Sequence, residues 1–254
     1  MFTQSTTTHS LSIPELDLVV PVHNEARAIR SSIQTLLNRL PTLLPISWVI
    51  TIIDNGSDDE TLQIAEEICS NHPRLVRVIS LSEKGRGRAL RHAWAKSLSP
   101  IVAYTDIDLS TNIAHLWPLI EPIYNRKTDG SVGNRLMSGS QTTRRLKREI
   151  LSRGYNAFVK ILFPRFSITD AQCGFKAFSR HVTDYIMPDV VNNNWFFDTE
   201  LLIRSELRGL TIHQIPVKWI EDLDSRVNLI PTIYENICGL VRLRLQTLVK
   251  TSGT

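Results

Sequence analysis

The sequence predicts an α/β fold, a single domain whose mostly parallel central sheet is flanked by helices. Short β-branched runs alternate with longer segments whose apolar residues recur at helical spacing. The composition, 42% hydrophobic and 21% charged over 254 residues, is typical of one ordinary globular domain. Strands and helices that alternate in this way imply βαβ units with right-handed crossovers, and therefore a sheet covered on both faces.

The first half of the chain contains four predicted strand and helix pairs. Residues 16–22 are a leucine and valine run that we expect to be a strand. Residues 25–40 follow as a helix, because Ile29, Ile33 and Leu40 recur at helical spacing. The later pairs are strand 48–53 with helix 61–69, strand 75–81 with helix 88–98, and strand 101–105 with helix 113–124.

The second half has a different pattern. A basic stretch covers residues 144–165, a turn-rich piece covers residues 169–174, and a long apolar and basic helix is expected at 231–250. No linker separates these parts from the first half. We therefore expect one domain at 14–250, preceded by a disordered Ser/Thr-rich tail at 1–13.

Charge and cysteine content narrow the classes of function. The net charge of +4 suits a polyanionic ligand such as a nucleotide or a lipid phosphate. Nucleic-acid binding is not expected, because no basic-aromatic module or zinc-finger spacing accompanies the charge. The three cysteines lack any C-x-x-C spacing, which argues against a disulfide framework and a zinc site. Without a secretory signal or an apolar run of roughly 20 residues, the protein is expected to be cytoplasmic with no transmembrane helix.

Acidic residues follow the predicted strands at the end where such sheets bind ligands. Asp106 and Asp108 form a D-x-D motif directly after strand 101–105, and Asp54 directly follows strand 48–53. Two carboxylates one residue apart can hold a hard cation, Mg²⁺ or Mn²⁺, together with phosphate oxygens. The alternative is that these residues only cap a helix or form a turn. Because both strands belong to one sheet, we expect the three carboxylates to face one crevice.

A glycine-rich loop adds a weaker signal. The segment Lys84-Gly85-Arg86-Gly87-Arg88 resembles a phosphate-binding loop ahead of a helix. It matches neither the Walker pattern nor G-x-G-x-x-G, so it indicates little by itself. A nucleotidyltransferase would carry such a loop directly after the first strand, where this chain has Pro21-Val22-His23-Asn24-Glu25.

The strand-end segments together resemble the family 2 inverting glycosyltransferases, which have a glycosyltransferase A fold, a single Rossmann-like domain. The resemblance covers residues 16–244, and its later blocks are similar to the dolichyl-phosphate mannose and glucose synthases, the polyprenyl-phosphate branch. The blocks that carry it are Val20-Pro21-Val22-His23-Asn24-Glu25, Ile53-Asp54-Asn55-Gly56-Ser57-Asp58-Asp59, Thr105-Asp106-Ile107-Asp108-Leu109-Ser110, Val132-Gly133-Asn134-Arg135, Arg148-Glu149-Ile150-Leu151-Ser152-Arg153-Gly154-Tyr155-Asn156, Asp170-Ala171-Gln172-Cys173-Gly174-Phe175-Lys176 and Trp195-Phe196-Phe197-Asp198-Thr199-Glu200.

The resemblance implies inverting transfer of a hexose from a nucleotide diphosphate sugar to a polyprenyl or dolichyl phosphate. UDP-glucose is the favoured donor, and GDP-mannose is the alternative. The metal would be Mg²⁺ or Mn²⁺, held by Asp106 and Asp108. The residues implied for the nucleotide sugar are Pro21, Val22, Glu25, Asp54, Lys84, Asp106 and Arg135.

The acceptor phosphate would meet Arg148, Ser152 and Arg226, because guanidinium geometry suits phosphate. One departure concerns Ile220, which stands where the family's acceptor motif has a further arginine. A second departure is Asn55 after Asp54, where many relatives have two aspartates. The alternative for the basic residues is a solvated face.

Asp198 is the remaining catalytic candidate, together with Asp108. If the acceptor is a sugar hydroxyl, Asp198 would accept its proton, whereas a phosphate acceptor needs no strong base. Asp198 would then orient the donor sugar. Two hypotheses compete with transfer to a polyprenyl phosphate. The protein would instead transfer the sugar to a hydroxyl of a saccharide or small molecule, or it would be a non-catalytic nucleotide-binding module.

Basic and apolar residues are mixed in two segments, 144–163 and 237–250, as they are in helices that lie on a membrane surface. These segments would place the protein peripherally on the cytoplasmic membrane face, or against a membrane-protein partner. The alternative is that their apolar residues pack on the sheet and their basic residues face water.

Overall fold

The computed structural model describes residues 12–143, 146–221 and 229–251. The strands are β1 (Leu16–Val22), β2 (Trp48–Asn55), β3 (Val76–Leu81), β4 (Ile101–Thr105), β5 (Gly130–Asn134), β6 (Gln141–Thr143), β7 (Phe175–Ser179), β8 (Ile212–Pro216) and β9 (Lys218–Ile220). The helices are α1 (Ile29–Leu43), α2 (Thr61–Asn71), α3 (Arg86–Lys96), α4 (Leu116–Tyr124), α5 (Leu146–Leu162), α6 (Arg180–Ile186), α7 (Phe197–Leu207) and α8 (Leu229–Thr251), with 3-10 turns η1 (Ile113–His115) and η2 (Met187–Asp189). The expected tail at 1–13 lies almost entirely outside the described residues.

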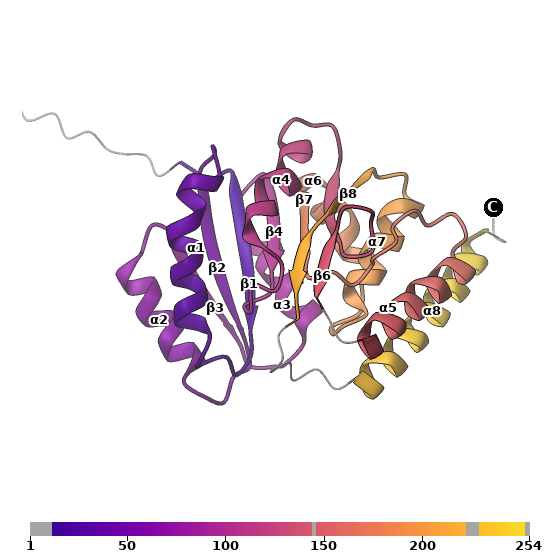
Figure 1. Cartoon of the computed structure of the whole chain (residues 1–254), viewed down its shortest axis with the longest axis horizontal. Coiled ribbons are helices and arrows are strands. Elements are labelled where there is room, and N and C mark those ends of the chain that lie inside the picture. Colours follow the sequence, from indigo (N-terminus) through magenta and orange to yellow (C-terminus); the bar gives the residue numbers. More distant parts are fainter. Residues whose placement is uncertain (1–11, 144–145, 222–228, 252–254) are drawn as a thin grey trace, which may run out of the picture.

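A seven-stranded sheet forms the centre of the molecule, in the order β3-β2-β1-β4-β7-β5-β8 (Figure 1). Strands β1, β2, β3 and β4 are parallel to one another, as are β5 and β8. Strand β7 runs antiparallel to both of its neighbours, β4 and β5. The predicted α/β fold with a mostly parallel sheet is therefore confirmed.

Each face of the sheet is covered by its own hydrophobic core, because side chains alternate between the two faces along each strand. On β1, Leu16, Leu18 and Val20 pack in one core with helices α1, α2 and α4. Val19 points to the other core, which contains apolar residues of α3, α5, α6, α7 and α8. The inner parallel strands β1, β2 and β4 are consequently buried on both sides, as βαβ connections require.

Three boundaries near the strand ends differ from the sequence prediction. Strand β2 continues through Asp54 and Asn55, which are 2% and 6% exposed. Helix α3 begins at Arg86, two residues earlier than expected. Helix α1 begins at Ile29 rather than at residue 25, because the Glu25 carbonyl closes a turn by accepting the backbone N–H of Ala28.

Strand β7 follows the turn-rich segment and was not predicted. Its register places Lys176 beside Tyr104 and Phe175 beside Thr105 of β4. The antiparallel pairing brings the start of β7 to the carboxyl end of β4. Residues 170–176 therefore reach the same edge as the D-x-D motif.

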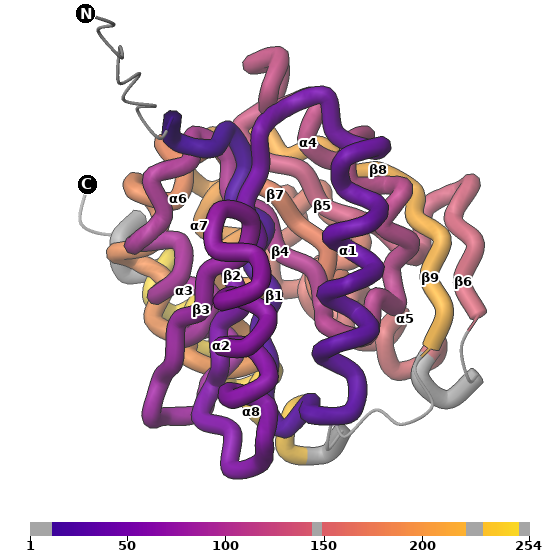
Figure 2. The backbone as a smooth tube through the Cα atoms, turned by 90° about the vertical axis from the view of Figure 1, so that its left-hand side faces the viewer, coloured from indigo at the N-terminus to yellow at the C-terminus, as the bar shows by residue number. Residues whose placement is uncertain are grey.

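Two peripheral pieces complete the fold. Strands β6 and β9 form a small separate parallel sheet, visible side by side at one edge in Figure 2. Helices α5 and α8 pack against each other at one end of the molecule (Figure 1). The inner face of α8 is tightly packed, since a Cβ on Gly239 would lie 2.3 Å from the Phe196 ring. The expected helix at 231–250 is thus a packed element of the domain.

Candidate functional site

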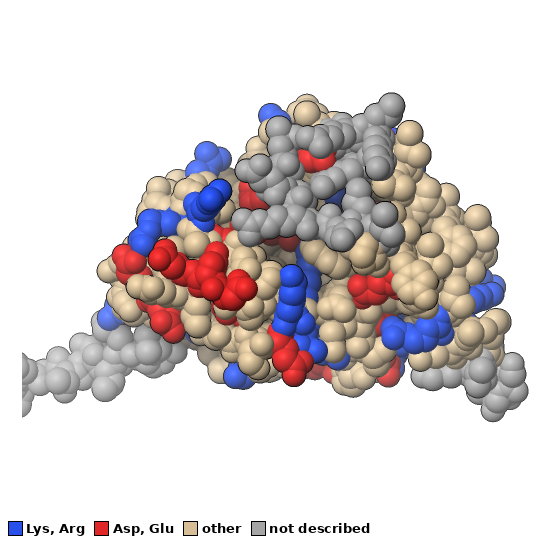
Figure 3. All heavy atoms as spheres, turned by 90° about the horizontal axis from the view of Figure 1, so that it is seen from below, with Lys and Arg blue, Asp and Glu red and all other residues tan. Residues whose placement is uncertain are grey.

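The carboxyl ends of β1, β2 and β4 lie along one edge of the sheet, the lower edge in Figure 1. Val22, the last residue of β1, pairs with Asp54. Figure 3 views the molecule from this side, where acidic side chains gather on the left part of the face. The topology therefore brings Asp54 and the D-x-D motif to one edge, as the sequence analysis expected.

Asp106 is the half-exposed carboxylate at the end of β4, with 36% of its side chain accessible. Its Oδ1 accepts a hydrogen bond from Nη2 of Arg86 at 2.7 Å. Burial raises the pKa of Asp106 to about 6; Arg86 opposes this rise, and the nearby carboxylates Asp108 and Asp198 add to it. Asp108 itself is exposed and accepts the backbone N–H of Ser110 at 2.9 Å.

Gly174 makes room for the Asp106 carboxylate. A Cβ at this position would lie 1.8 Å from Oδ2 of Asp106 and 2.9 Å from Nη2 of Arg86. Any other residue here would force the carboxylate to move. The Cys173-Gly174 turn before β7 is therefore fitted to the D-x-D motif at the end of β4.

Asp198 lies on the same guanidinium as Asp106, that of Arg86, within a buried polar network. Its Oδ1 accepts hydrogen bonds from Nζ of Lys176 at 2.8 Å and from the hydroxyl of Tyr104. Its Oδ2 is 3.9 Å from Nε of Arg86. The side chains of Lys176 and Asp198 are 0% and 4% exposed, so this ion pair is shielded from water. Burial and the charge of Asp198 raise the pKa of Tyr104 well above its usual value, which keeps the phenol protonated.

Arg135 is held by a second buried ion pair. Its Nε and Nη2 donate to the two carboxylate oxygens of Asp170 at 2.7 and 2.8 Å, and its backbone N–H donates to the same carboxylate. The guanidinium also lies over the ring of Trp219, at 5.4 Å from the centroid. Burial would raise the pKa of Asp170, but Arg135 outweighs this and lowers it. Arg135 is thus fixed in position before any ligand binds.

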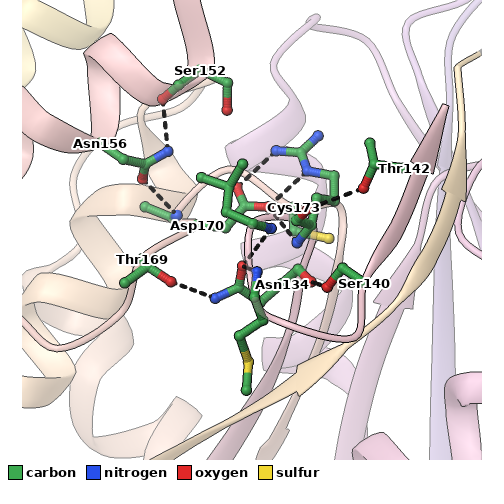
Figure 4. Close-up of polar contacts among 12 residues, drawn as sticks. Asn134, Ser140, Thr142, Ser152, Asn156, Thr169, Asp170 and Cys173 are labelled. Carbon is green, nitrogen blue, oxygen red and sulfur yellow. Dashed lines mark hydrogen bonds and ion pairs between the residues drawn. The ribbon is translucent and has the colours of Figure 1, made fainter. Parts of the chain in front are cut away.

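The turn that carries Asp170 is tied to helix α5. Asn156 donates to the backbone carbonyl of Ser152 at 2.9 Å and accepts the backbone N–H of Ala171 at 3.1 Å (Figure 4). On the other side, Asn134 donates to the hydroxyl of Thr169 at 2.6 Å. Ser152 is half-buried. These bonds explain how α5 and β5 fix the same turn.

The remaining donor-site candidates lie along the ends of β1, β2 and β3. Val22 is buried, and Pro21 is half-buried. The backbone N–H of Glu25 donates to Thr61 at 2.7 Å, which fixes the turn after β1. Asp54 accepts weak bonds from Ser57 and Ser80, while its Oδ1 is buried without a hydrogen-bond partner among the described residues.

The glycine-rich loop presents a different cation from the one the sequence analysis selected. Lys84 is exposed, and its role stays a prediction. Arg86 is the residue whose guanidinium reaches the carboxylates, with only 14% of its side chain accessible. Asn55 holds the loop in place by accepting the backbone N–H of Gly85 at 2.7 Å. This contact gives Asn55, the second departure noted in the sequence, a structural use.

Sequence reasoning therefore missed four residues that the structure brings to this edge: Arg86, Tyr104, Lys176 and Asp170. The signal for Arg86 was present in the glycine-rich loop. The side chain of Arg148 and the whole of Arg226, both expected to meet an acceptor phosphate, lie outside the described residues.

Comparison with known proteins identifies the family. The model of Glycosyl transferase family 2 matches residues 17–186, about two thirds of the chain. The chain belongs to this family. Its central sheet flanked by helices is that of a glycosyltransferase A fold, so the predicted family and fold are both confirmed.

Several curated relatives are similar over most of the chain. Glycosyltransferase AglD of Haloferax volcanii is 36% identical over 86% of this chain, which spans only 35% of AglD. The dolichyl-phosphate beta-glucosyltransferase of Saccharomyces cerevisiae is 28% identical over 92% of this chain and 75% of the yeast protein. The human protein of the same name is 28% identical, with 82% and 68% covered. These names agree with the polyprenyl-phosphate branch that the sequence resembles.

Solved structures agree on the fold. Glucosyl-3-phosphoglycerate synthase from Mycobacterium tuberculosis in complex with UDP has a TM-score of 0.66 at 20% identity, with 91% of this chain and 80% of that chain covered. The same enzyme in complex with Mn²⁺, UDP-glucose and phosphoglyceric acid gives 0.66 at 19% identity, with the same coverage. Within the described part of this chain, no helix is both long and apolar enough to cross a membrane.

Proposed function

We propose that this family 2 enzyme transfers a hexose, with inversion, from a nucleoside diphosphate sugar to a polyprenyl phosphate in a metal-dependent reaction. UDP-glucose is the preferred donor. The observation that carries the proposal is the half-exposed Asp106, which stands beside exposed Asp108 and is flanked by the fixed cations Arg86 and Arg135. An acidic pair with two cations nearby suits a metal and a diphosphate together.

The residues present fit a hard divalent cation. Asp106 and Asp108 offer carboxylate oxygens, and the missing side chain of Gly174 leaves the Asp106 carboxylate its space. Among the described residues, no group of three or more His, Cys, Asp or Glu side chains could hold a metal. Two carboxylates would therefore share Mg²⁺ or Mn²⁺ with diphosphate oxygens and water. The bound cation would stabilise the charge that develops on the leaving diphosphate.

Asp198 supports a phosphate acceptor over a hydroxyl acceptor. Its Oδ1 already accepts bonds from Lys176 and Tyr104, and only 4% of its side chain is accessible. A general base for a sugar hydroxyl must reach the acceptor, which this carboxylate does not do in the present arrangement. A phosphate oxygen carries negative charge at neutral pH and needs no base. Asp198 then positions Arg86, whose Nε is 3.9 Å from its Oδ2, and orients the donor sugar through such neighbours rather than by direct contact.

The reaction is a single displacement at the anomeric carbon. A phosphate oxygen of the acceptor forms the new bond to this carbon while the bond to the nucleoside diphosphate breaks, and the configuration inverts. The diphosphate departs with the electron pair of the broken bond. Arg135, held rigidly by Asp170, keeps a guanidinium near the reacting phosphates without further ordering. Arg148, Ser152 and Arg226 remain the candidates for the acceptor phosphate.

The net charge of α5 and α8 and the exposed apolar residues of α8 suit a peripheral position on an anionic membrane. Helix α5 has four basic residues and one acidic, and α8 has three and one, so the pair carries +5 against +4 for the whole chain. A single stripe of exposed apolar residues also runs along α8, at spacings of three and four residues. The stripe consists of Tyr234, Ile237, Val241, Leu245 and Leu248.

The test is transfer of radiolabel from UDP-glucose or GDP-mannose to undecaprenyl or dolichyl phosphate with Mg²⁺ or Mn²⁺. We expect label from UDP-glucose in the organic phase, abolished by EDTA and by Asp108→Ala. Asp58→Ala is a matched control, because Asp58 is an exposed aspartate in the β2 turn. Binding of UDP without any lipid labelling from either donor would refute the polyprenyl-phosphate assignment.

A further inference from the structure

Arg86 is enclosed by two carboxylates and two aromatic rings. Its Nη2 is 2.7 Å from Oδ1 of Asp106, and its Nε is 3.9 Å from Oδ2 of Asp198. The guanidinium carbon lies 5.4 Å from the centroid of Tyr104 and 4.9 Å from that of Trp195. The side chain starts at the first residue of α3, so its stem is fixed by the helix. This is a cation held in a defined place at the edge of the site.

The other cations of the network have different partners. Lys176 is bonded to Asp198, Tyr104 and the Cys173 carbonyl. Arg135 uses two guanidinium nitrogens on Asp170. Among the described side chains, Arg86 is therefore the cation that directly neutralises Asp106.

We propose that Arg86 and the divalent cation compete for Asp106, and that the donor diphosphate relieves this competition by accepting the displaced guanidinium. The proposal rests on the function proposed above and adds a role for a residue of this chain. Arg86 acts as an internal substitute for the metal in the empty enzyme. It becomes a phosphate-binding group when metal and nucleotide arrive together.

The charges explain why the affinities for the divalent metal ion and for the donor diphosphate should depend on each other. A divalent ion and a guanidinium that share one carboxylate repel each other strongly in a partly buried site. A diphosphate supplies the negative charge that both cations need, and its oxygens match the guanidinium fork. The metal ion alone should therefore bind weakly, and bound UDP should raise the affinity of the protein for the metal ion. By linkage, the metal must tighten UDP by the same factor.

A purely structural role for Arg86 predicts the opposite sign. If Arg86 only supports the Asp106 carboxylate, its removal should leave metal binding unchanged or weaker. If Arg86 competes, its removal should strengthen the binding of metal alone. The sign of this one change distinguishes the two roles.

The experiment measures Mn²⁺ binding by electron paramagnetic resonance of free Mn²⁺, with and without UDP, and without acceptor or turnover. For wild type we expect UDP to tighten Mn²⁺ by about tenfold or more. For Arg86→Gln we expect Mn²⁺ alone to bind about tenfold more tightly than in wild type, with a smaller enhancement by UDP. Arg86→Met, whose stem can still lie between the two rings, should behave in the same way.

Arg88→Gln is the matched control. It removes the same charge from the same first turn of α3, where Arg88 pairs with exposed Glu83 at 2.5 Å rather than with Asp106. Its Mn²⁺ affinity should stay within about twofold of wild type. The competition is refuted if Arg86→Gln or Arg86→Met binds Mn²⁺ alone no more tightly than wild type, or if UDP leaves the wild-type affinity unchanged. Absence of Mn²⁺ binding even with UDP would instead refute the metal site on which the proposed function rests.

Discussion

Lys176 of β7 donates to Oδ1 of Asp198 at the start of α7, 2.8 Å away, and neither side chain is more than 4% exposed. A lysine and an aspartate are rarely buried so completely unless they pair with each other. This pair connects an antiparallel strand to a helix and fixes the carboxylate that lies behind Arg86 and Asp106. It is the internal support of the candidate site.

Removing one member of this pair should be strongly destabilising. Lys176→Met leaves Asp198 charged, buried and short of a cation, and we expect the free energy of unfolding to fall by about 3–5 kcal/mol. Urea denaturation checks this value. The double variant Lys176→Met with Asp198→Asn should recover a large part of the loss, because no unpaired buried charge remains. Arg153→Met breaks an exposed pair with Glu149 and should change stability by about 0.5 kcal/mol or less. If Lys176→Met lowered the free energy of unfolding no more than Arg153→Met does, the buried-pair account would be wrong.

Gly174→Ala tests the fit of the β7 turn to the D-x-D motif. The new Cβ would meet the Asp106 carboxylate at 1.8 Å, so the carboxylate must move from its present place. We expect Mn²⁺ affinity in the presence of UDP to fall by roughly 10- to 100-fold, as for changes next to metal ligands. Gly154→Ala in α5 is the control, since its Cβ would meet nothing within 4 Å. Unchanged metal affinity in Gly174→Ala would remove Asp106 from the metal site.

Asp17 predicts a pH dependence of stability. This residue of β1 is 1% exposed, and burial raises its pKa above 3.8, an effect that the nearby Ser97 and Thr51 hydroxyls oppose only in part. The folded state then binds the proton more tightly than the unfolded state, so stability falls as pH rises from 3.8 through the higher folded pKa. Asp17→Asn should be more stable than wild type at pH 7, and the difference should shrink towards pH 4. Thermal unfolding across this range measures it, and an equal pH slope in both proteins would show that Asp17 does not contribute.

Leu245→Glu tests the membrane surface proposed for α8. Leu245 is 59% exposed in the apolar stripe, so the variant should fold normally. Losing the burial of one leucine, about 1.5–3 kcal/mol, corresponds to roughly tenfold to hundredfold weaker binding to vesicles that contain anionic phospholipid. Leu98→Glu, at a site 64% exposed beyond α3, should bind vesicles like wild type. Equal sedimentation of wild type and Leu245→Glu with these vesicles would argue that the stripe does not contact lipid.

The sequence predicted the first half of the fold well, because each parallel strand there is a mostly apolar, β-branched run followed by a helix of regular period. Strand β7 escaped prediction because Lys176 interrupts its apolar pattern. That lysine is buried only because it meets Asp198, which is 22 residues away in sequence. Such a pairing is a tertiary effect that local periodicity does not contain.

The acidic residues of the candidate site were predictable from the sequence, whereas the contacts of its basic residues were not. Asp54 and Asp106 follow from strand order, since carboxyl ends of parallel strands share an edge. Whether Lys84 or Arg86 reaches the carboxylates depends on where α3 begins. The helix begins at Arg86, two residues earlier than expected, and the Arg86 guanidinium bonds to Asp106. The Arg135 and Asp170 pair depends on the position of the β7 turn, which the sequence pattern leaves open.

Inverting transfer to a phosphate oxygen would leave a defined linkage in the lipid product. The product made from UDP-glucose and undecaprenyl phosphate would be purified and examined by proton and phosphorus nuclear magnetic resonance. We predict one glucosyl residue in β configuration, joined to the lipid through a phosphodiester that mild acid cleaves. An α-linked product, or glucose joined to a hydroxyl by an acid-stable bond, would contradict the account.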